Sequence, residues 1–193
     1  MKRKPPARSK PRRTAASARR TRTKRPAAKH AHAALAAVVR CALITVSDTR
    51  GRADDTSGDV LELELTRGGH SIISRGWVRD ERAAIRRAVE TAIEAPQVDV
   101  VLLTGGTGLA PRDVTPEAIA PLAERRLPGF GELFRMLSYR EVGAAAWLSR
   151  AGAIVARGKL VVFLPGSTAA VRLAATRLLV PELAHAVRLL GPR

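Results

Sequence analysis

A loop rich in glycine and threonine stands near the middle of the sequence, where residues 104–118 read TGGTGLAPRDVTPEA. Because glycine has no Cβ atom, the backbone N–H groups of such a loop can point at an anion that approaches closely, and the N-terminus of a following helix favours negative charge. Threonine hydroxyl groups supply further donors. The sequence therefore predicts a phosphate-binding loop formed by Thr104, Gly105, Gly106, Thr107 and Gly108.

The loop departs from two common nucleotide-binding motifs. No Gly-Lys-Ser/Thr sequence follows it, as a Walker A motif requires, and Pro111 stands where a dinucleotide-binding fingerprint needs glycine. A tight turn that only packs a helix against a strand is the alternative interpretation of these glycines.

Two aspartates stand where they can serve phosphate chemistry: Asp113 soon after the glycine loop, and Asp80 just beyond a predicted strand at residues 70–78. Transfer of a nucleotidyl group to a phosphate needs a divalent cation, because the phosphate oxygens repel one another. Mg²⁺ typically takes one or two carboxylates and completes its coordination with substrate phosphates. Asp80 and Asp113 are therefore candidate Mg²⁺ ligands. An N-cap of the next helix or a surface acid is the alternative for each, and one carboxylate can both cap a helix and face the metal.

The elements that must position these residues follow from the apolar patterning, with period two for strands and helical spacing for helices. The predicted strands cover 41–49, 70–78 and 98–104, with a hairpin over 151–167. The predicted helices cover 54–69, 81–94, 115–125, 130–142 and 168–190, the last one kinked at Pro181. The N-cap candidates of the first helix are Asp54, Asp55, Thr56 and Ser57.

Strands that alternate with helices predict an α/β fold, a three-layer α/β/α sandwich with a mostly parallel central sheet. In such sheets, ligands bind outside the carboxyl ends of the strands. Three predicted strands end in polar or glycine-rich clusters, so we expect these clusters to line one rim of the sheet. The clusters are Ser47-Asp48-Thr49, the 104–108 loop and Pro165-Gly166-Ser167.

The formal net charge of +17 is concentrated at the N-terminus, because residues 1–32 are rich in Lys and Arg and contain no Asp or Glu. Proline, alanine and like charge without apolar periodicity predict a disordered basic tail over residues 1–34, followed by one α/β domain over residues 35–193. A solvated extension, a polyanion-binding arm and a cleaved targeting peptide are the three interpretations of the tail. Nucleic acid is expected as a partner only through residues 1–32.

The cysteine content and hydropathy exclude several classes of protein. Cys41 is the single cysteine, so no internal disulfide can form, which fits a cytoplasmic location, and we expect it to be a buried small hydrophobe. No apolar run approaches the roughly 18 residues that would span a bilayer, so no membrane partner is expected.

Four segments in this order and spacing resemble the MoaB/MogA family of molybdenum cofactor biosynthesis proteins. They are TGGTGLAPRDVTPEA, LPGFGELFRMLS (127–138), LSR (148–150) and LPGS (164–167). The resemblance covers residues 41–190, nearly the whole predicted domain. FRMLSYREVG and PGSTAAVRLA are similar to the MoaB branch in particular.

The resemblance implies a domain that binds molybdopterin and, in active members, uses Mg²⁺ and ATP to convert it to adenylyl-molybdopterin and pyrophosphate. By motif position, Asp80 and Asp113 match the catalytic aspartates, and the glycine loop matches the nucleotide-phosphate site with Ser47 and Asp48 beside it. Glu132 matches the GFGE motif of the family only loosely. The implied molybdopterin-binding residues are Ser149, Arg150, Pro165, Gly166 and Ser167.

Other molybdenum cofactor biosynthesis proteins are the implied partners, and members of the family form homo-oligomers, trimers or hexamers. Arg150 and Arg112 can add positive charge to the site. Two functions of different class stay open: a molybdopterin adenylyltransferase, and a non-catalytic molybdopterin-binding or scaffold protein whose basic tail recruits an anionic partner.

Overall fold

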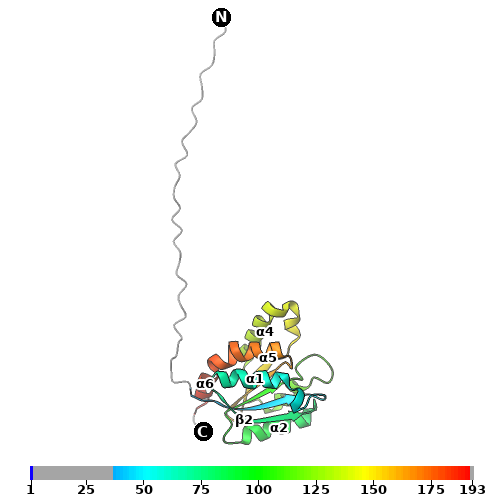
Figure 1. Ribbon diagram of the computed structural model, residues 1–193, viewed down its shortest axis with the longest axis vertical. Helices are drawn as coiled ribbons and strands as arrows, with labels where there is room; N and C mark the ends of the chain where they lie inside the picture. Colours follow the sequence, from blue (N-terminus) through cyan, green and yellow to red (C-terminus); the bar gives the residue numbers. More distant parts are fainter. Residues whose placement is uncertain (2–36, 192–193) are drawn as a thin grey trace. The chain divides into compact units, whose positions relative to one another are not determined.

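A six-stranded sheet forms the centre of the computed structural model, which describes residue 1 and residues 37–191 (Figure 1). The predicted disordered tail, residues 1–34, lies outside the described residues except for Met1. The strand order is β2-β1-β3-β6-β5-β4. The strands are β1 (Arg40–Val46), β2 (Ser71–Val78), β3 (Val100–Thr104), β4 (Arg125–Arg126), β5 (Gly152–Ala156) and β6 (Lys159–Leu164).

The sheet is mostly parallel, as the sequence predicts. β2, β1, β3 and β6 run parallel, while β5 is antiparallel to β6 and β4 is antiparallel to β5. Every residue of β3 and β6 is buried, because helices cover both faces of the sheet. The antiparallel β5–β6 pair confirms the hairpin predicted over residues 151–167.

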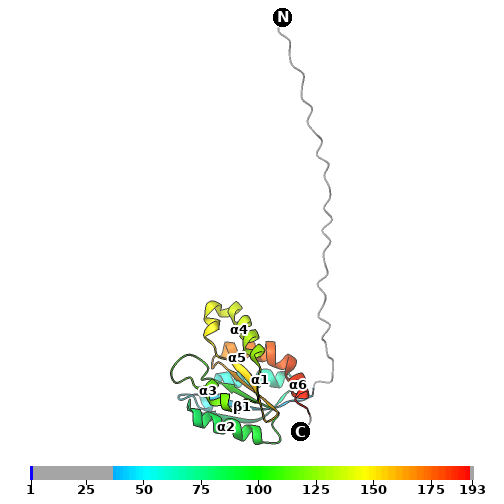
Figure 2. The same ribbon diagram turned by 180° about the vertical axis from the view of Figure 1, so that it is seen from behind.

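Helices cover the two faces of the sheet and complete the three-layer sandwich (Figures 1 and 2). One face packs against α1, α4, α5 and α6, and the other packs against α2 and α3. The helices are α1 (Thr56–Arg67), α2 (Arg82–Glu94), α3 (Thr115–Ile119), α4 (Pro128–Val142), α5 (Thr168–Ala174) and α6 (Val180–Leu189). None of the helices in the described residues is both long and apolar enough to cross a membrane.

Successive side chains of a strand point to opposite faces of the sheet, which divides the core into two halves. In β1, Cys41 and Leu43 pack toward α1, whereas Ala42 and Ile44 pack toward α2. Cys41 is fully buried, as expected for a small hydrophobe, and burial raises the pKa of its thiol to about 12.

The helix predicted over residues 115–125 is wrong in its second half. α3 ends at Ile119, a 3₁₀ turn covers Ala120–Leu122, and Arg125–Arg126 forms the edge strand β4. Pro121 explains the early end, because its ring clashes with the carbonyl group four residues earlier and it has no N–H to donate.

The helix predicted over residues 168–190 is also interrupted. A π-helical turn at Ala175–Leu179 separates α5 from α6 and lies directly before Pro181, the residue at which the sequence predicts a kink.

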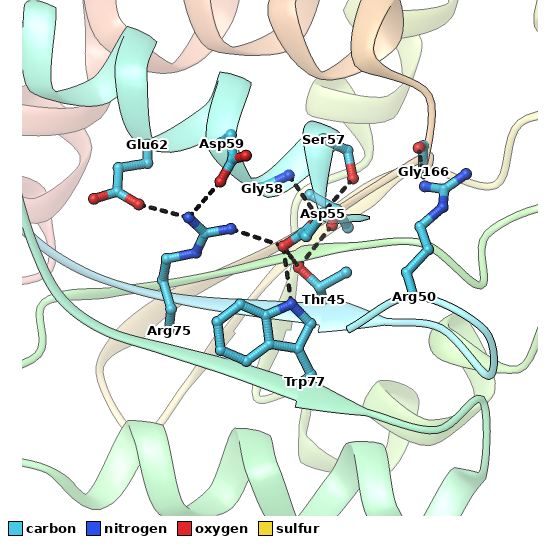
Figure 3. Close-up of polar contacts among 11 residues, drawn as sticks. Thr45, Arg50, Asp55, Ser57, Gly58, Asp59, Glu62, Arg75, Trp77 and Gly166 are labelled. Carbon is cyan, nitrogen blue, oxygen red and sulfur yellow. Dashed lines mark hydrogen bonds and ion pairs between the residues drawn. The ribbon is translucent and has the colours of Figure 1, made fainter. Parts of the chain in front are cut away.

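Asp55 joins the first helix to the sheet through a buried network of donors (Figure 3). It is the N-cap of α1, where its Oδ1 accepts the N–H of Gly58 at 2.9 Å. Its Oδ2 accepts the Thr45 hydroxyl group at 2.6 Å, the Arg75 guanidinium group at 2.8 Å and the Trp77 indole N–H at 3.1 Å. Burial raises the pKa of Asp55, but these hydrogen bonds together outweigh it and hold the pKa below its ordinary value.

We expect Asp55→Asn to lower the free energy of unfolding by roughly 3 kcal/mol, because it leaves Arg75 with an amide group in place of a buried charge. The lowered pKa means that the stabilisation is present above the unfolded-state pKa of about 3.9 and is lost as the pH falls through the folded-state value. The difference from wild type, measured by urea unfolding, should therefore shrink in acid.

Asp59→Asn is the matched control, because Asp59 also contacts Arg75 but its side chain is 62% exposed. Asp59→Asn should lower the free energy of unfolding by less than about 1 kcal/mol. If Asp55→Asn and Asp59→Asn lowered the free energy of unfolding equally, a special role for the buried carboxylate would be contradicted.

Candidate functional site

A cavity of about 600 Å³ opens at the carboxyl ends of β1, β3 and β6. The three strands end at one level, because Thr45 pairs with Thr104 and Thr104 pairs with Leu164. The loops that follow the strands therefore meet at one rim, as the sequence predicts. The predicted site residues that line the cavity are Ser47, Asp48, Asp80, Gly105, Gly106, Thr107, Gly108, Asp113, Ser149, Pro165, Gly166 and Ser167.

The glycine loop needs glycine at its first two turning positions. Gly105 and Gly106 have φ angles of 98° and 64°, in the left-handed region that side chains disfavour. A Cβ atom on Gly105 would collide with the carbonyl oxygen of Val46, and one on Gly106 would lie 2.7 Å from Oδ1 of Asp80. The bare backbone therefore lets the loop pass between the end of β1 and a carboxylate.

Hydrogen bonds fix this loop to the elements around it. The N–H of Gly105 donates to the carbonyl oxygen of Leu164 at 2.9 Å. The Thr115 hydroxyl group donates to the Gly105 carbonyl at 3.0 Å, and the Thr115 N–H donates to the Gly106 carbonyl at 3.0 Å. The loop is thus held before any ligand arrives.

Asp80 and Asp113 flank the glycine loop, and neither caps a helix. The N-cap residues of α2 and α3 are Glu81 and Val114, and neither helix has a capping side chain. Oδ1 of Asp80 instead accepts the Val114 N–H at 3.3 Å, and Oδ2 of Asp113 accepts the Ala110 N–H at 3.0 Å. The capping alternative is therefore wrong for both residues.

The two carboxylates share one electrostatic environment. Burial and the negative charge of Asp113 raise the pKa of Asp80, although the hydrogen bond from the Val114 N–H lowers it. This repulsion between like charges is what a bound cation would relieve. Within residues 37–191 no group of three or more His, Cys, Asp and Glu side chains could hold a metal ion. Two carboxylates beside the glycine loop fit Mg²⁺, whose remaining ligands can be water and substrate oxygens.

The loop after β1 also lines the cavity. The hydroxyl oxygen of Ser47 accepts the N–H groups of Thr49 and Arg50 at 3.3 and 3.0 Å. Asp48 forms an ion pair with Arg112 and accepts the backbone N–H of Asp80 at 3.1 Å. Asp48 therefore ties the loop after β1 to the residues on either side of the glycine loop.

Two predicted site residues lie behind the cavity rather than on its wall. Thr104 is buried, and its hydroxyl group donates to that of Thr45 at 3.5 Å. Arg150 donates from Nε to the Gly108 carbonyl at 2.8 Å, and its guanidinium group also bonds to the Asp113 carbonyl and to Glu117. Arg150 thus supports the loop that carries Asp113.

The loosely assigned Glu132 is exposed on α4 and does not line the cavity.

Thr49 lines the cavity as part of the predicted Ser47-Asp48-Thr49 cluster, but sequence reasoning did not single out three other residues that line it: Val46, Arg50 and Leu148. Arg50 donates from Nη1 to the Gly166 carbonyl at 3.0 Å, which joins the loops after β1 and β6 (Figure 3). The only available signal was its position directly after the Ser47-Asp48-Thr49 cluster.

A smaller compartment of about 170 Å³ adjoins the cavity and shares Ser149, Pro165 and Ser167 with it. Phe134, Ala146 and Leu173 contribute to its mainly apolar walls. Ser138 also lines it; this residue is 7% exposed, and its hydroxyl oxygen has no hydrogen-bond partner in the described part of the chain. An unpaired buried hydroxyl group in a cavity wall is suited to bind a polar group of a ligand.

Comparison with known proteins shows the family to which this chain belongs. A model described as a probable molybdopterin binding domain matches residues 42–185. Molybdenum cofactor biosynthesis protein B of Bacillus subtilis is 52% identical over 152 residues, 78% of this chain and 89% of that protein. A crystal structure of molybdenum cofactor biosynthesis protein B is 44% identical with a TM-score of 0.79, and the match covers 82% of this chain and 99% of that chain. The structure of the molybdopterin biosynthesis enzyme MoaB from Thermus thermophilus is 36% identical with a TM-score of 0.71, over 81% of this chain and 98% of that chain.

These similarities assign the fold to the class of molybdopterin-binding proteins that take part in molybdenum cofactor biosynthesis. Within that class, the chain belongs to the molybdenum cofactor biosynthesis protein B family, known as MoaB. The resemblance inferred from the four sequence segments is confirmed.

We expect Asp113→Asn to lower the pKa of Asp80 toward the ordinary value of about 3.9, because it removes the neighbouring negative charge. Since a raised carboxyl pKa means that folding disfavours the ionised form, Asp80 lowers the free energy of unfolding as the pH rises from the unfolded-state pKa of about 3.9 to the folded-state pKa, and this loss is constant above the folded-state pKa. Carboxyl ¹³C NMR titration of the wild type and the variant measures the shift.

Asp59→Asn serves as the control for this titration, because Asp59 lies on α1 and does not line the cavity. An Asp80 pKa that is the same in all three proteins would contradict the shared environment of the two carboxylates.

Proposed function

We propose that this protein is an Mg²⁺-dependent and ATP-dependent molybdopterin adenylyltransferase. The observation that carries the proposal is the pair of carboxylates, Asp80 and Asp113, that flank the glycine loop in one cavity without capping a helix. Both are held by backbone N–H groups beside the place where phosphates would bind. Family membership supplies molybdopterin as the second substrate.

In the proposed reaction, an oxygen of the terminal phosphate of molybdopterin attacks the α-phosphorus of ATP. The bond from the α-phosphorus to the bridging oxygen breaks, pyrophosphate leaves, and adenylyl-molybdopterin remains. Positioning and charge neutralisation do most of the work in such phosphoryl chemistry. Mg²⁺ held by Asp80 and Asp113 would neutralise the phosphate oxygens when it is bound.

The residues of the chain contribute mainly by orienting the substrates. The loop from Gly105 to Gly108 receives the nucleotide phosphates, and Arg150 holds this loop through the Gly108 carbonyl. Ser47 and Asp48 line the same cavity. These contacts leave the chain little to rearrange during the reaction, which favours rapid transfer.

The smaller compartment beside Ser149, Pro165 and Ser167 is our proposed site for the pterin ring of molybdopterin. Its mainly apolar walls suit a flat bicyclic ring, and the unpaired hydroxyl group of Ser138 can bond to a polar edge of that ring. Because the compartment opens beside the cavity, the phosphate end of the same molecule would reach toward the glycine loop.

We expect Asp80→Ala and Asp113→Ala each to lower turnover at least about 100-fold, because each removes a ligand of the catalytic cation. The free energy of unfolding should change by less than about 1 kcal/mol, since neither carboxylate caps a helix. Formation of labelled adenylyl-molybdopterin from molybdopterin and Mg-ATP measures turnover, and urea unfolding measures stability.

Asp59→Ala is the control that removes a carboxylate outside the cavity. Unfolding of either site variant at room temperature would assign a structural role to its carboxylate. Molybdopterin binding by a wild-type protein that forms no adenylylated product would favour the non-catalytic alternative.

We further propose that the protein is a homo-oligomer, a trimer or hexamer, which buries an apolar face of α4 and the 3₁₀ turn after it. Phe134 on α4 is buried in the core, so the opposite side of the helix is left to solvent. The exposed apolar residues are Leu133, Met136, Tyr139, Val142 and Trp147, which are 48%, 50%, 64%, 58% and 71% exposed. An apolar patch of this extent marks an interaction surface.

A Met136→Lys, Tyr139→Glu double variant should dissociate the oligomer, because it places charges in the proposed contact. Light scattering after gel filtration gives the mass of the particle. Leu63→Lys is the control, since Leu63 is exposed on α1. A monomeric wild type, or an oligomer that the double variant leaves intact, would contradict the proposal.

A further inference from the structure

The arginines around the cavity differ in how their charges are balanced. Within the described residues, Arg50 and Arg112 line the cavity, and Arg150 lies just behind it. Arg112 is paired with Asp48, and Arg150 is paired with Glu117. Two of the three cations thus already have carboxylate partners.

Arg50 contacts a neutral acceptor instead. Its Nη1 donates to the backbone carbonyl of Gly166 at 3.0 Å (Figure 3). Its backbone N–H donates to the Ser47 hydroxyl oxygen. The side chain is exposed on the cavity wall. A guanidinium group bonded to one carbonyl oxygen keeps most of its donors available for an anion.

Gly166 places the guanidinium group of Arg50 close to the glycine loop. A Cβ atom placed on Gly166 would lie 3.4 Å from Cα of Gly105 and 3.7 Å from Nη1 of Arg50. Gly166 is therefore the point where the loops after β1, β3 and β6 meet. A phosphate group on the glycine loop would lie within reach of Arg50 after a change of side-chain rotamer.

We infer that Arg50 is a phosphate-binding residue that exchanges the Gly166 carbonyl for phosphate oxygens when substrate enters. A phosphate carries a negative charge that the Gly166 carbonyl lacks, and the planar guanidinium group can bind two of its oxygens at once. The Gly166 carbonyl keeps the side chain extended toward the cavity until that exchange. Arg50 thereby supplies a positive charge that Arg112 and Arg150, already paired, do not.

Two phosphate groups have this chemistry: the polyphosphate of ATP and the terminal phosphate of molybdopterin. The inference rests on the proposed function for the carrier of the phosphate, but binding can be measured without turnover. Inorganic pyrophosphate with Mg²⁺ represents the first source, and molybdopterin itself represents the second.

Arg50→Gln should weaken binding of one of these probes by roughly 10- to 100-fold, as expected for the loss of a charged hydrogen bond. Calorimetric titration with Mg-pyrophosphate and fluorescence titration with molybdopterin provide the two arms. Arg50→Lys, which keeps the charge but loses the planar fork, should fall between wild type and Arg50→Gln. Arg52→Gln is the control, because Arg52 lies two residues along the chain and does not line the cavity.

Weaker pyrophosphate binding assigns Arg50 to the polyphosphate, and weaker molybdopterin binding assigns it to the pterin phosphate. The thermal unfolding midpoint of Arg50→Gln without ligand should match that of wild type, which separates binding from a structural role. Unchanged affinity for both probes would overturn the inference. A protein that binds these probes through Arg50 but forms no adenylylated product would overturn only the proposed function.

Discussion

The common level at which three parallel strands end is the constraint on which the candidate site depends. Thr45, Thr104 and Leu164 are paired across β1, β3 and β6, and the three strands end within one residue of this level, since β3 and β6 end at the paired residues and β1 ends at Val46. The hydrogen bond from the Gly105 N–H to the Leu164 carbonyl continues this register one residue beyond β3. A slip of one residue would send each side chain to the opposite face and separate the loops.

A chain of polar groups beneath the rim stabilises that arrangement. The Thr104 hydroxyl group donates to Thr45, and the Thr45 hydroxyl group donates to the buried carboxylate of Asp55. The N-terminus of α1 is thereby joined to β1 and β3 just before the cavity begins. Buried polar networks in which the members are paired favour one rigid arrangement, which suits a site that must hold substrates in fixed positions.

The features that the sequence predicted well are local in origin. The strands were predictable from apolar runs, and the shared rim was predictable because polar and glycine clusters follow those runs directly. Pro121 offered a local signal for the early end of α3, whereas the longer helix was predicted from Pro116, which suits a first helical turn.

Other features depend on tertiary contacts that no local pattern contains. Phe134 and Met136 both fit a helical stripe, and only the packing of α4 decides that Phe134 is buried while Met136 is half exposed. Arg75 and Trp77 reach Asp55 because β2 pairs with β1 in one particular register. The role proposed for Arg50 rests on its contact with Gly166, which is distant in the sequence.

The central claim is that the rim of the sheet brings nucleotide phosphates and a cation together between Asp80 and Asp113. A crystal structure with Mg²⁺ and an ATP analogue whose α–β bridge cannot be cleaved tests this claim most directly. We expect phosphates on the loop from Gly105 to Gly108 and Mg²⁺ bound by carboxylate oxygens of both aspartates. A nucleotide bound elsewhere, or a cation that contacts neither aspartate, would contradict it.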